Sequence, residues 1–480
     1  MGAVDFDQLI QGPIELLEKH PEAAKKITSQ FSQIMVDEFQ DTNKSQFKLI
    51  KLLLKDHNNL TVVGDDDQSI YGWRGAEIEN ILRFPQSFKN CKIVKLVRNY
   101  RCNPAILDMA NAVIAKNTDR HGKKLIAEKK STSVNKPEFF EFESEEQEAE
   151  KTLAEFVRLK REGVSYKDIA VLYRSNSQGA LLESYLRKEK IPYRISGGTA
   201  FFDRKEIKDI LAYLRCAIYP SEIALRRIMN TPARGIGTTS IEKLQKSNMN
   251  FVAACRHWKD LGLPEKAGTS IDQLLQSFLD FQNDLIKAPS FSACVKNYLQ
   301  KIGYMKYLED QSKSMEAYHK TKSLVDIFCH VFDSYQKQES KNPKKALVEF
   351  VENMELRDLP DEENKDEINL LTFHACKGLE FSHVFLLGVE EDLIPHRVLG
   401  TNISEERRLF YVAITRAKDR LYLSRAKKRN RNGRMVNTQR SRFLLELKPE
   451  FFTVLEGGRP ITETDRESLV SSFLAKFNNP

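Results

Sequence analysis

Two acidic clusters, each directly after a short apolar run, constrain the fold of this chain most. Asp37 and Glu38 follow residues 34–36 in IMVDEFQD, and Gln68 ends the second cluster in LTVVGDDDQ. Short apolar runs bounded by turn-forming residues are typical of buried strands, and helix-like residues 42–54 separate these two. Because the carboxyl ends of parallel strands meet at one edge of a sheet, the pattern predicts a parallel α/β sheet with acidic side chains and an amide at that edge.

Such an edge is suited to the hydrolysis of a nucleoside triphosphate. One carboxylate is needed to hold Mg²⁺ and a second group to orient or deprotonate water, and we expect Asp37 and Glu38 to meet these needs. Gln68, just beyond a strand end, can sense the terminal phosphate. The alternative for an apolar run followed by Asp-Glu is a solvated acidic turn, which is the commoner origin of that pattern taken alone. The 480 residues contain no GxxxxGK[ST] phosphate loop.

The loop that follows Gln68 combines aromatic and cationic side chains. Tyr71, Trp73 and Arg74 lie within the glycine-punctuated segment IYGWRGA. Aromatic rings on such a loop can stack on the bases of a single strand, at about 1–3 kcal/mol per base. The alternative is an aromatic anchor that packs the loop onto a core, and the sequence leaves both readings open for Trp73.

Further candidate ligands lie beyond residue 100. Arg101 in RNYRCNP and Arg416 in YVAITRAK are candidate phosphate ligands, since guanidinium groups stabilise charge on phosphoryl oxygens. In TFHACKGLEF, Glu380 is a candidate for a ribose hydroxyl, and Thr372 and His374 are candidates for a nucleic-acid backbone. The alternatives are surface arginines at helix ends and a histidine in a core or cap.

The order of the expected elements divides the chain. Strand-like and helix-like segments alternate in the first and last parts, and amphipathic helices dominate between them, which predicts a helical block inserted into a second sheet. A charged, loop-like segment, 359–367, marks the end of this helical block.

The expected strands are 34–36, 60–63, 92–96, 137–142, 169–173, 191–195, 368–373, 383–388 and 420–424. The expected helices are 42–54, 103–116, 144–161, 177–190, 205–215, 271–286 and 404–417. The expected domains are 1–99 (the C-terminal part of a first α/β domain), 100–196 and 367–450 (two parts of a second), 197–366 (the helical insert) and 451–480 (a polar tail).

Charge and cysteine usage narrow the class of protein. The net charge is +8, and the basic run 425–434 contrasts with the acidic segments 143–150 and 361–367. A concentrated basic run indicates a polyanion partner, although such runs are also common as solvated faces. The seven cysteines form no CxxC pair, and no apolar run approaches the about 18 residues that span a bilayer. We therefore expect a reduced, cytoplasmic protein without a membrane segment.

Taken together, these segments resemble the UvrD/Rep/PcrA family of superfamily-one DNA helicases, nearest to Rep. DEFQD resembles the second helicase motif of the family and GDDDQSIYGWRGA the third, while NYRC, TFHACKGLEF and EERRLFYVAITRAK resemble the fourth, fifth and sixth. The resemblance runs from Val4 to about Leu447. It implies two RecA-like P-loop NTPase domains, the first incomplete, with a mostly helical domain inserted in the second.

The resemblance also implies roles for single residues, with ATP and Mg²⁺ as cofactors. Asp37 would hold Mg²⁺ and Glu38 would activate water. The nucleotide contacts would come from Gln68, Tyr100, Arg101, Gly378, Glu380 and Arg416. The single-strand path would be lined by Tyr71, Trp73, Arg74, Thr372 and His374. A loop with Gly235 and Gly237 would contact duplex DNA.

The function implied is that of an ATP-dependent 3′–5′ DNA helicase, which acts on single-stranded DNA and at junctions of single and double strands in replication or repair. The resemblance also leaves open two further kinds of partner: replication or repair proteins, and a second copy of the chain. One departure concerns the start: VDFDQLI (4–10) resembles a segment well inside the first half of the family. The expectation is thus an N-terminally truncated chain. The alternative is a single-stranded-DNA-binding module without ATPase activity, and a helical insert used for partner docking is a third possibility.

Overall fold

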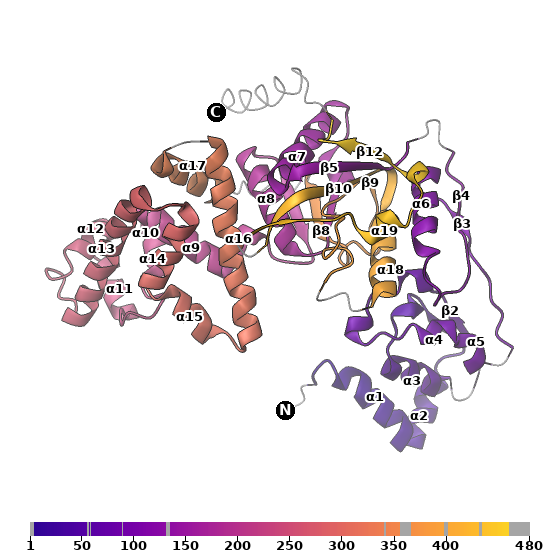
Figure 1. The fold of residues 1–480 in the computed structure, drawn as a ribbon. Coiled ribbons are helices and arrows are strands. Elements are labelled where there is room, and N and C mark those ends of the chain that lie inside the picture. The colour runs from indigo at the N-terminus through magenta and orange to yellow at the C-terminus, as the bar shows by residue number, and fades with distance from the viewer. Residues whose placement is uncertain are drawn as a thin grey trace.

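The computed structural model describes residues 4–459, apart from 55–56, 58, 89, 131–134, 340–341, 356–365, 398–401 and 432–433. Figure 1 shows a small α/β part at the N-terminus, a large sheet with helices packed around it, and a lobe made of helices on the far side of that sheet. Two expectations, the loop over 359–365 and the tail over 460–480, lie outside the described residues.

A parallel pair of strands forms the N-terminal part. β1 (Ile34–Val36) pairs with β2 (Leu60–Val62), and α3 (Lys44–Leu53) connects them, as the sequence predicts. The side chains and backbone amides of Asn43 and Gln46 bond reciprocally at the start of α3, which is a capping box. The other elements of this part are α1 (Gln8–Lys19), α2 (Pro21–Thr28), η1 (Phe39–Asp41), η2 (Asp66–Gln68), η3 (Gly72–Arg74), α4 (Glu79–Leu82) and α5 (Phe84–Ser87).

The prediction of a third strand in this part, over residues 92–96, is wrong. Residues 91–97 are extended but pair with no strand among the described residues, and Ile93, Val94 and Leu96 are exposed. Regular pairing begins only at β3 (Arg98–Asn99), which joins β4 (Ile126–Ala127). An apolar run has the composition of a strand, but a strand also needs a neighbour to satisfy its backbone, and this segment has none there.

One parallel sheet is assembled from two separate stretches of chain. Its strand order is β12-β5-β10-β9-β6-β8-β7, with β11 antiparallel to β10. The neighbours β7 and β8 are separated in sequence by the whole helical lobe, which confirms the expected insertion of a helical block into a second α/β sheet. The strands are β5 (Glu138–Ser144), β6 (Ile169–Tyr173), β7 (Tyr193–Ser196), β8 (Ile368–Thr372), β9 (Phe381–Leu386), β10 (Ala417–Arg431), β11 (Arg434–Asn437) and β12 (Thr453–Glu456).

Helices cover both faces of this sheet. In β6, Ala170 and Leu172 face a core shared with α6 and α18, whereas Val171 and Tyr173 face a core shared with α7 and α8. A central parallel strand is apolar on both sides for this reason. The helices are α6 (Pro104–Ile114), α7 (Glu145–Arg161), α8 (Gly179–Lys188), α18 (Ile403–Ile414) and α19 (Arg442–Leu445), with 3-10 turns η4 (Tyr166–Asp168), η5 (Asn176–Gln178) and η7 (Pro449–Phe451).

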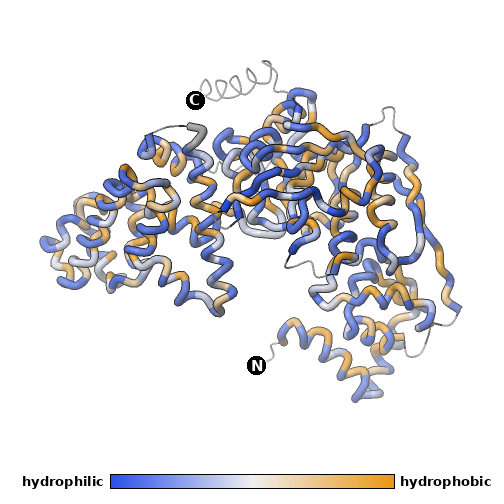
Figure 2. Tube along the Cα trace, in the orientation of Figure 1, coloured by the Kyte–Doolittle hydropathy of each residue, from blue (hydrophilic) through white to orange (hydrophobic). Residues whose placement is uncertain are grey.

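The insert consists of helices throughout its described residues. They alternate between hydrophobic and hydrophilic residues along their length (Figure 2), and their apolar faces join one core with the α7 side of the sheet. The elements are η6 (Phe201–Asp203), α9 (Lys205–Ile218), α10 (Glu222–Ile228), α11 (Thr238–Gln245), α12 (Phe251–Arg256), α13 (Glu265–Lys287), α14 (Phe291–Lys301), α15 (Tyr304–Gln311), α16 (Met315–Glu339) and α17 (Pro343–Glu355).

The end of the sheet departs from expectation. β10 runs well beyond the expected 420–424, and β12 pairs with β5 inside the stretch expected to be a polar tail from residue 451. The short run TVLE after two phenylalanines carries enough β-forming residues to add an edge strand. Among the described residues, no helix is long and apolar enough to cross a membrane.

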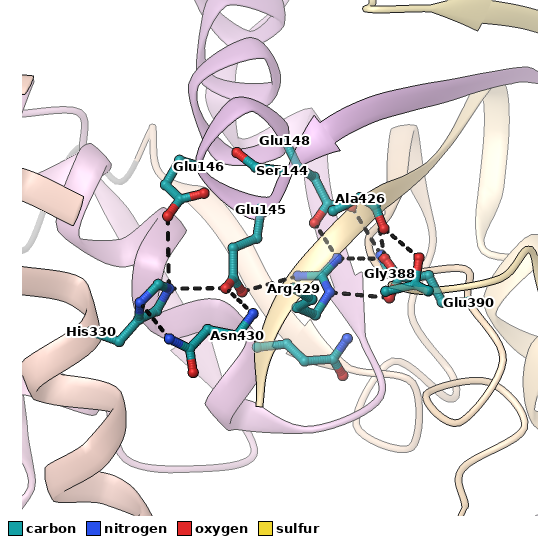
Figure 3. A network of polar contacts seen from close by, with 12 residues as sticks. Ser144, Glu145, Glu146, Glu148, His330, Gly388, Glu390, Ala426, Arg429 and Asn430 are labelled. Carbon is teal, nitrogen blue, oxygen red and sulfur yellow. Dashed lines mark hydrogen bonds and ion pairs between the residues drawn. The ribbon is translucent and has the colours of Figure 1, made fainter. Parts of the chain in front are cut away.

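The basic run 425–434 is part of the β10–β11 hairpin. Its alternate side chains Arg425, Lys427, Arg429 and Arg431 each form an ion pair with a carboxylate. Arg429 is buried and meets Glu148 and Glu390 at 2.6 and 2.7 Å (Figure 3). Much of the charge of this run is therefore neutralised within the fold, which weakens the interpretation of the run as a free polyanion surface.

Candidate nucleotide and nucleic-acid sites

The first acidic pair lies directly after β1, where the sequence predicts it. Glu38 has φ of +49°, a left-handed conformation that is uncommon outside glycine, and Asp37 Oδ1 accepts from its backbone amide at 2.8 Å. Both side chains are exposed, and Glu38 stands at a strained position of the turn. Backbone strain of this kind clusters at functional sites.

Gln40 connects this pair to the second acidic cluster. It is buried; its Nε2 donates to Glu38 Oε2 at 2.5 Å, and its Oε1 accepts from the backbone amide of Asp65 at 2.9 Å. Asp65 Oδ2 in turn accepts from Gln68 Nε2 at 2.7 Å. A chain of hydrogen bonds thus joins Glu38 to Gln68. Gln40 was not predicted from the sequence, and its place two residues after Glu38 in DEFQD was the available signal.

Lys377, in the turn after β8 of the second sheet, contacts the same acidic residues of the N-terminal part. Its Nζ lies 3.3 Å from Glu38 Oε2, forms an ion pair with Asp41, and donates to the backbone carbonyl of Gln68 at 3.1 Å. Burial raises the pKa of Asp41, and the hydrogen bond and charge of Lys377 oppose that rise. Lys377 was also missed, although it lies in the same segment as the expected Gly378 and Glu380.

Asp37 fits one ligand of Mg²⁺. It is exposed at the strand end, and no ion pair within the described residues engages it. Carboxylates of this kind are the ligands that Mg²⁺ prefers, usually beside several waters and substrate phosphates. The close acidic group Asp65–Asp67 is a poorer candidate, because lysine and arginine side chains already contact it.

The expected nucleotide contacts of the second sheet gather around one ion pair. Arg101 Nε donates to Glu380 Oε2 at 2.6 Å, and this hydrogen bond and charge lower the pKa of Glu380. Tyr100 beside it is 73% exposed, and Gly378, with φ of +82°, forms the turn that leads to Glu380. The structure therefore brings four of the expected nucleotide contacts together.

Arg416 lies next to this group but faces inward. It is 2% exposed, and its guanidinium donates to the backbone carbonyls of Val412 and Leu379 at 3.0 and 3.2 Å and to Thr415 Oγ1 at 3.1 Å. Burial lowers its pKa. The expected contact of Arg416 with the terminal phosphate stays a prediction, since its guanidinium is bonded to backbone carbonyls in this structure.

The aromatic candidates form a second cluster, which we call the aromatic face: Tyr71, Trp73, Arg74 and His374. The Trp73 and His374 rings are 6.1 Å apart and edge-on, and the Arg74 guanidinium lies 4.6 Å from the Trp73 ring. Trp73 is 63% exposed, whereas Ile70 in the same loop is fully buried. The core anchor of the loop is therefore Ile70, and Trp73 is available to a ligand.

His374 carries no charge at neutral pH. Burial and the nearby Arg174 lower its pKa to about 4. Thr372, at the end of β8, accepts from the backbone amide of Ala375 at 3.2 Å and so caps the turn that presents His374. Both residues support the aromatic face rather than add charge to it.

The expected duplex-contacting glycines lie elsewhere. Gly235 has φ of +71° and Gly237 is the N-cap of α11, so both belong to the insert. Figure 1 places α11 at the opposite end of the molecule from α3 and β2. These glycines are therefore not brought together with the other site residues.

Two protein-family models match the sequence of this chain. The model of the UvrD/REP helicase N-terminal domain matches residues 1–89, and that of the UvrD-like helicase C-terminal domain matches residues 94–428. The second match alone covers well over half of the chain. The chain belongs to the UvrD-like helicase family. The junction between the two matches falls in the extended segment that leads from α5 to β3.

Close relatives within the UvrD-like helicases are named ATP-dependent DNA helicase PcrA. The protein of Staphylococcus epidermidis is 40% identical over 459 residues, which is 93% of this chain and 62% of the relative. That of Staphylococcus aureus is 39% identical over the same lengths. The chain thus spans 62% of the length of these relatives. The expected nearness to Rep stays a prediction.

Proposed function

We propose that the protein is an ATP-dependent DNA helicase that moves 3′ to 5′ along single-stranded DNA and opens duplexes at single-strand junctions in replication or repair. The observation that carries this proposal is the loop 65–74. One end is bonded through Gln40 to Glu38, and the other end presents Trp73 on the aromatic face. One loop therefore joins a hydrolysis site to a surface for bases.

The residues around the expected nucleotide have separate tasks. Asp37 is the ligand for Mg²⁺, which neutralises phosphate charge when bound. Glu38 orients the attacking water and accepts its proton. Gln68 and Arg101 meet the terminal phosphate, and Glu380 meets the ribose. Arg101 Nε and Glu380 Oε2 bond to each other here, which leaves the terminal guanidinium nitrogens of Arg101 for the phosphate and the other oxygen of Glu380 for the ribose.

The exposed rings of the aromatic face provide the surface on which the bases of single-stranded DNA stack. A planar base gains about 1–3 kcal/mol by stacking on an aromatic ring, and Arg74 beside Trp73 adds a cation for the backbone. Tyr71 and Trp73 come from the first part of the chain and His374 from the second sheet. Movement of the two parts on ATP turnover therefore changes the spacing of the rings that hold the strand.

The proposal is tested by Glu38→Gln in the protein expressed from its complete coding sequence. We expect DNA-stimulated ATP hydrolysis to be lost, because the amide cannot accept a proton, while single-strand binding remains. Glu22→Gln, an exposed acid on α2, is the matched control. Turnover that survives Glu38→Gln contradicts the role of Glu38, and equal unwinding of 3′-tailed and 5′-tailed duplexes contradicts the direction.

A second candidate function is a single-stranded-DNA-binding module without ATP turnover. The absence of GxxxxGK[ST] from the 480 residues favours it, since this loop cradles the phosphates in P-loop enzymes. It predicts that residues 1–480 bind a labelled oligothymidine but do not hydrolyse ATP. Turnover by residues 1–480 that Glu38→Gln abolishes excludes this candidate.

A further inference from the structure

Three consecutive aspartates precede Gln68 in an unfavourable setting. We call Asp65, Asp66 and Asp67 the triple-aspartate turn. An oxygen from each lies within 4.8 Å of the others, and Asp66 and Asp67 are only 2% and 1% exposed. Buried like charges repel one another and lose their hydration. The turn keeps its shape only if cations are supplied to it.

The cations come from the segment after α6, which belongs to the second sheet. Arg120 binds Asp67 with two hydrogen bonds of 2.8 and 2.6 Å, and Lys123 Nζ lies 2.8 Å from Asp66 Oδ1. The carboxylates raise the pKa of Lys123 more than its burial lowers it, so its charge persists at every physiological pH. These side chains occupy the space between the carboxylates.

Lys123 contacts more of the triple-aspartate turn than Arg120 does. Its Nζ also forms an ion pair with Asp65 Oδ1, and the other oxygen of Asp65 accepts from Gln68 Nε2 at 2.7 Å. The Gln68 amide nitrogen carries two hydrogens. When Asp65 takes one of them, the direction of the second is set.

The segment that carries Lys123 is fixed to the second sheet. Asn117 Nδ2 donates to the backbone carbonyl of Ser404 at 2.9 Å, and its Oδ1 accepts from Arg407 Nε at 3.0 Å. Both partners flank or lie on α18, which also packs against α6. A shift of the second sheet is thus transmitted to Lys123.

We propose that Lys123 is a positioning residue for Gln68 and that it acts through Asp65. The inference rests on the proposed function, in which Gln68 meets the terminal phosphate of ATP. Lys123 holds Asp65, Asp65 orients the Gln68 amide, and a shift of the second sheet is passed to that amide. Arg120 stabilises the same turn without touching Asp65.

The test is steady-state ATP hydrolysis at saturating single-stranded DNA, with the protein expressed from its complete coding sequence. We expect Lys123→Gln to lower kcat about tenfold, within the range that a misplaced catalytic group costs, and to change KM for ATP and DNA affinity by less than about twofold. Lys123→Arg should restore most of kcat. Asp65→Asn, which keeps an oxygen for the backbone amide of Asp67 that Asp65 caps, should lower kcat as much as Lys123→Gln.

A double-mutant cycle separates positioning from general loosening. In the Gln68→Ala background, Lys123→Gln should lower kcat no further, since its target is gone. The control is Lys124→Gln, an exposed neighbour, because Arg120 also donates to the backbone carbonyl of Lys123 at 3.0 Å and its loss would disturb Lys123 itself. The inference is overturned if kcat is unchanged in both Lys123→Gln and Asp65→Asn. It is also overturned by a full further loss in the double variant, or by an equal loss in Lys124→Gln. Absence of turnover in the unsubstituted protein overturns the proposed function and this inference with it.

Discussion

Arg101 Nε donates to Glu380 Oε2 at 2.6 Å, so two residues expected at opposite ends of a nucleotide bond directly to each other. Their side chains are 30% and 46% exposed. An ion pair this accessible contributes at most about 1 kcal/mol, because solvent screens it. The pair therefore keeps both groups in place without a large barrier to a ligand that needs them apart.

Arg101→Gln should separate catalysis from stability. We expect kcat for DNA-stimulated ATP hydrolysis to fall by at least about 100-fold, since an arginine at the transferred phosphoryl group is worth more than that. The melting temperature should hardly change, because the lost pair is exposed. Arg98→Gln, an exposed arginine three residues earlier, is the control. A kcat within threefold of the unsubstituted protein contradicts contact between Arg101 and the phosphate.

Trp73→Ala should weaken single-strand binding by about 1–3 kcal/mol, the worth of one stacked base. The measurement is the fluorescence anisotropy of a labelled oligothymidine. Tyr219→Ala, an exposed aromatic in the insert, controls for loss of a surface ring. Equal affinity of the Trp73→Ala variant and the unsubstituted protein would remove Trp73 from the path of the strand.

Arg74 and His374 should differ in the salt dependence of the same binding. A cation that neutralises one phosphate contributes about one unit to the slope of log K against log salt. Arg74→Gln should lower the slope by about that amount at pH 7. His374→Asn should leave the slope unchanged, because its pKa of about 4 keeps the ring neutral, and a charge on it appears only as the pH falls toward that value. A reduced slope in His374→Asn at pH 7 would show that the ring is charged.

The elements that the sequence predicts well are those whose pattern is local. Residues 34–38 combine an apolar run with acids at its end, and that pattern needs no knowledge of distant residues. The run at 92–96 has the same local signal, but whether it pairs depends on a neighbouring strand that the pattern does not contain. Local pattern therefore predicts which residues can form a strand, and pairing decides which do.

The site residues that were missed depend on partners far away in the chain. Gln40 acts through Asp65, and Lys377 through Glu38 and Asp41, and neither contact can be inferred from spacing. The basic run around Arg429 misleads for a related reason. A segment rich in lysine and arginine predicts an exposed basic surface. Alternate residues of a strand can nevertheless all face carboxylates of neighbouring elements.

The polar contacts between the helical insert and the sheet include a histidine, His330, whose charge changes with pH. His330 on α16 lies 2.9 Å from Glu145 Oε1 and 4.0 Å from Glu146 Oε1, both in the first turn of α7 (Figure 3). Asn430 of β10 and Ser334 of α16 bond into the same group. Burial lowers the pKa of His330, but the close carboxylate of Glu145, with that of Glu146, raises it by more.

The sign of the pH effect follows from this raised pKa. A histidine whose pKa is higher in the folded protein stabilises it fully below the pKa of the unfolded chain, about 6.5, and the contribution is lost as the pH rises through the folded pKa. Glu145 also binds Arg429, a cation that does not titrate in this window. Contact between the insert and α7 should therefore be firmest in mild acid and weaken above neutrality.

His330→Gln tests this dependence, because it cannot take up a proton. Amide hydrogen exchange in the first turn of α7 and in α16, corrected for intrinsic pH dependence, should be faster in the variant at pH 6 by about tenfold, since a close charge pair couples by about 1.5 kcal/mol or more. The difference should shrink as the pH is raised to 8.5. His319→Gln, an exposed histidine on the same helix, should exchange like the unsubstituted protein. A difference that is constant with pH would mean that His330 acts by packing and that its charge has no part in holding the insert.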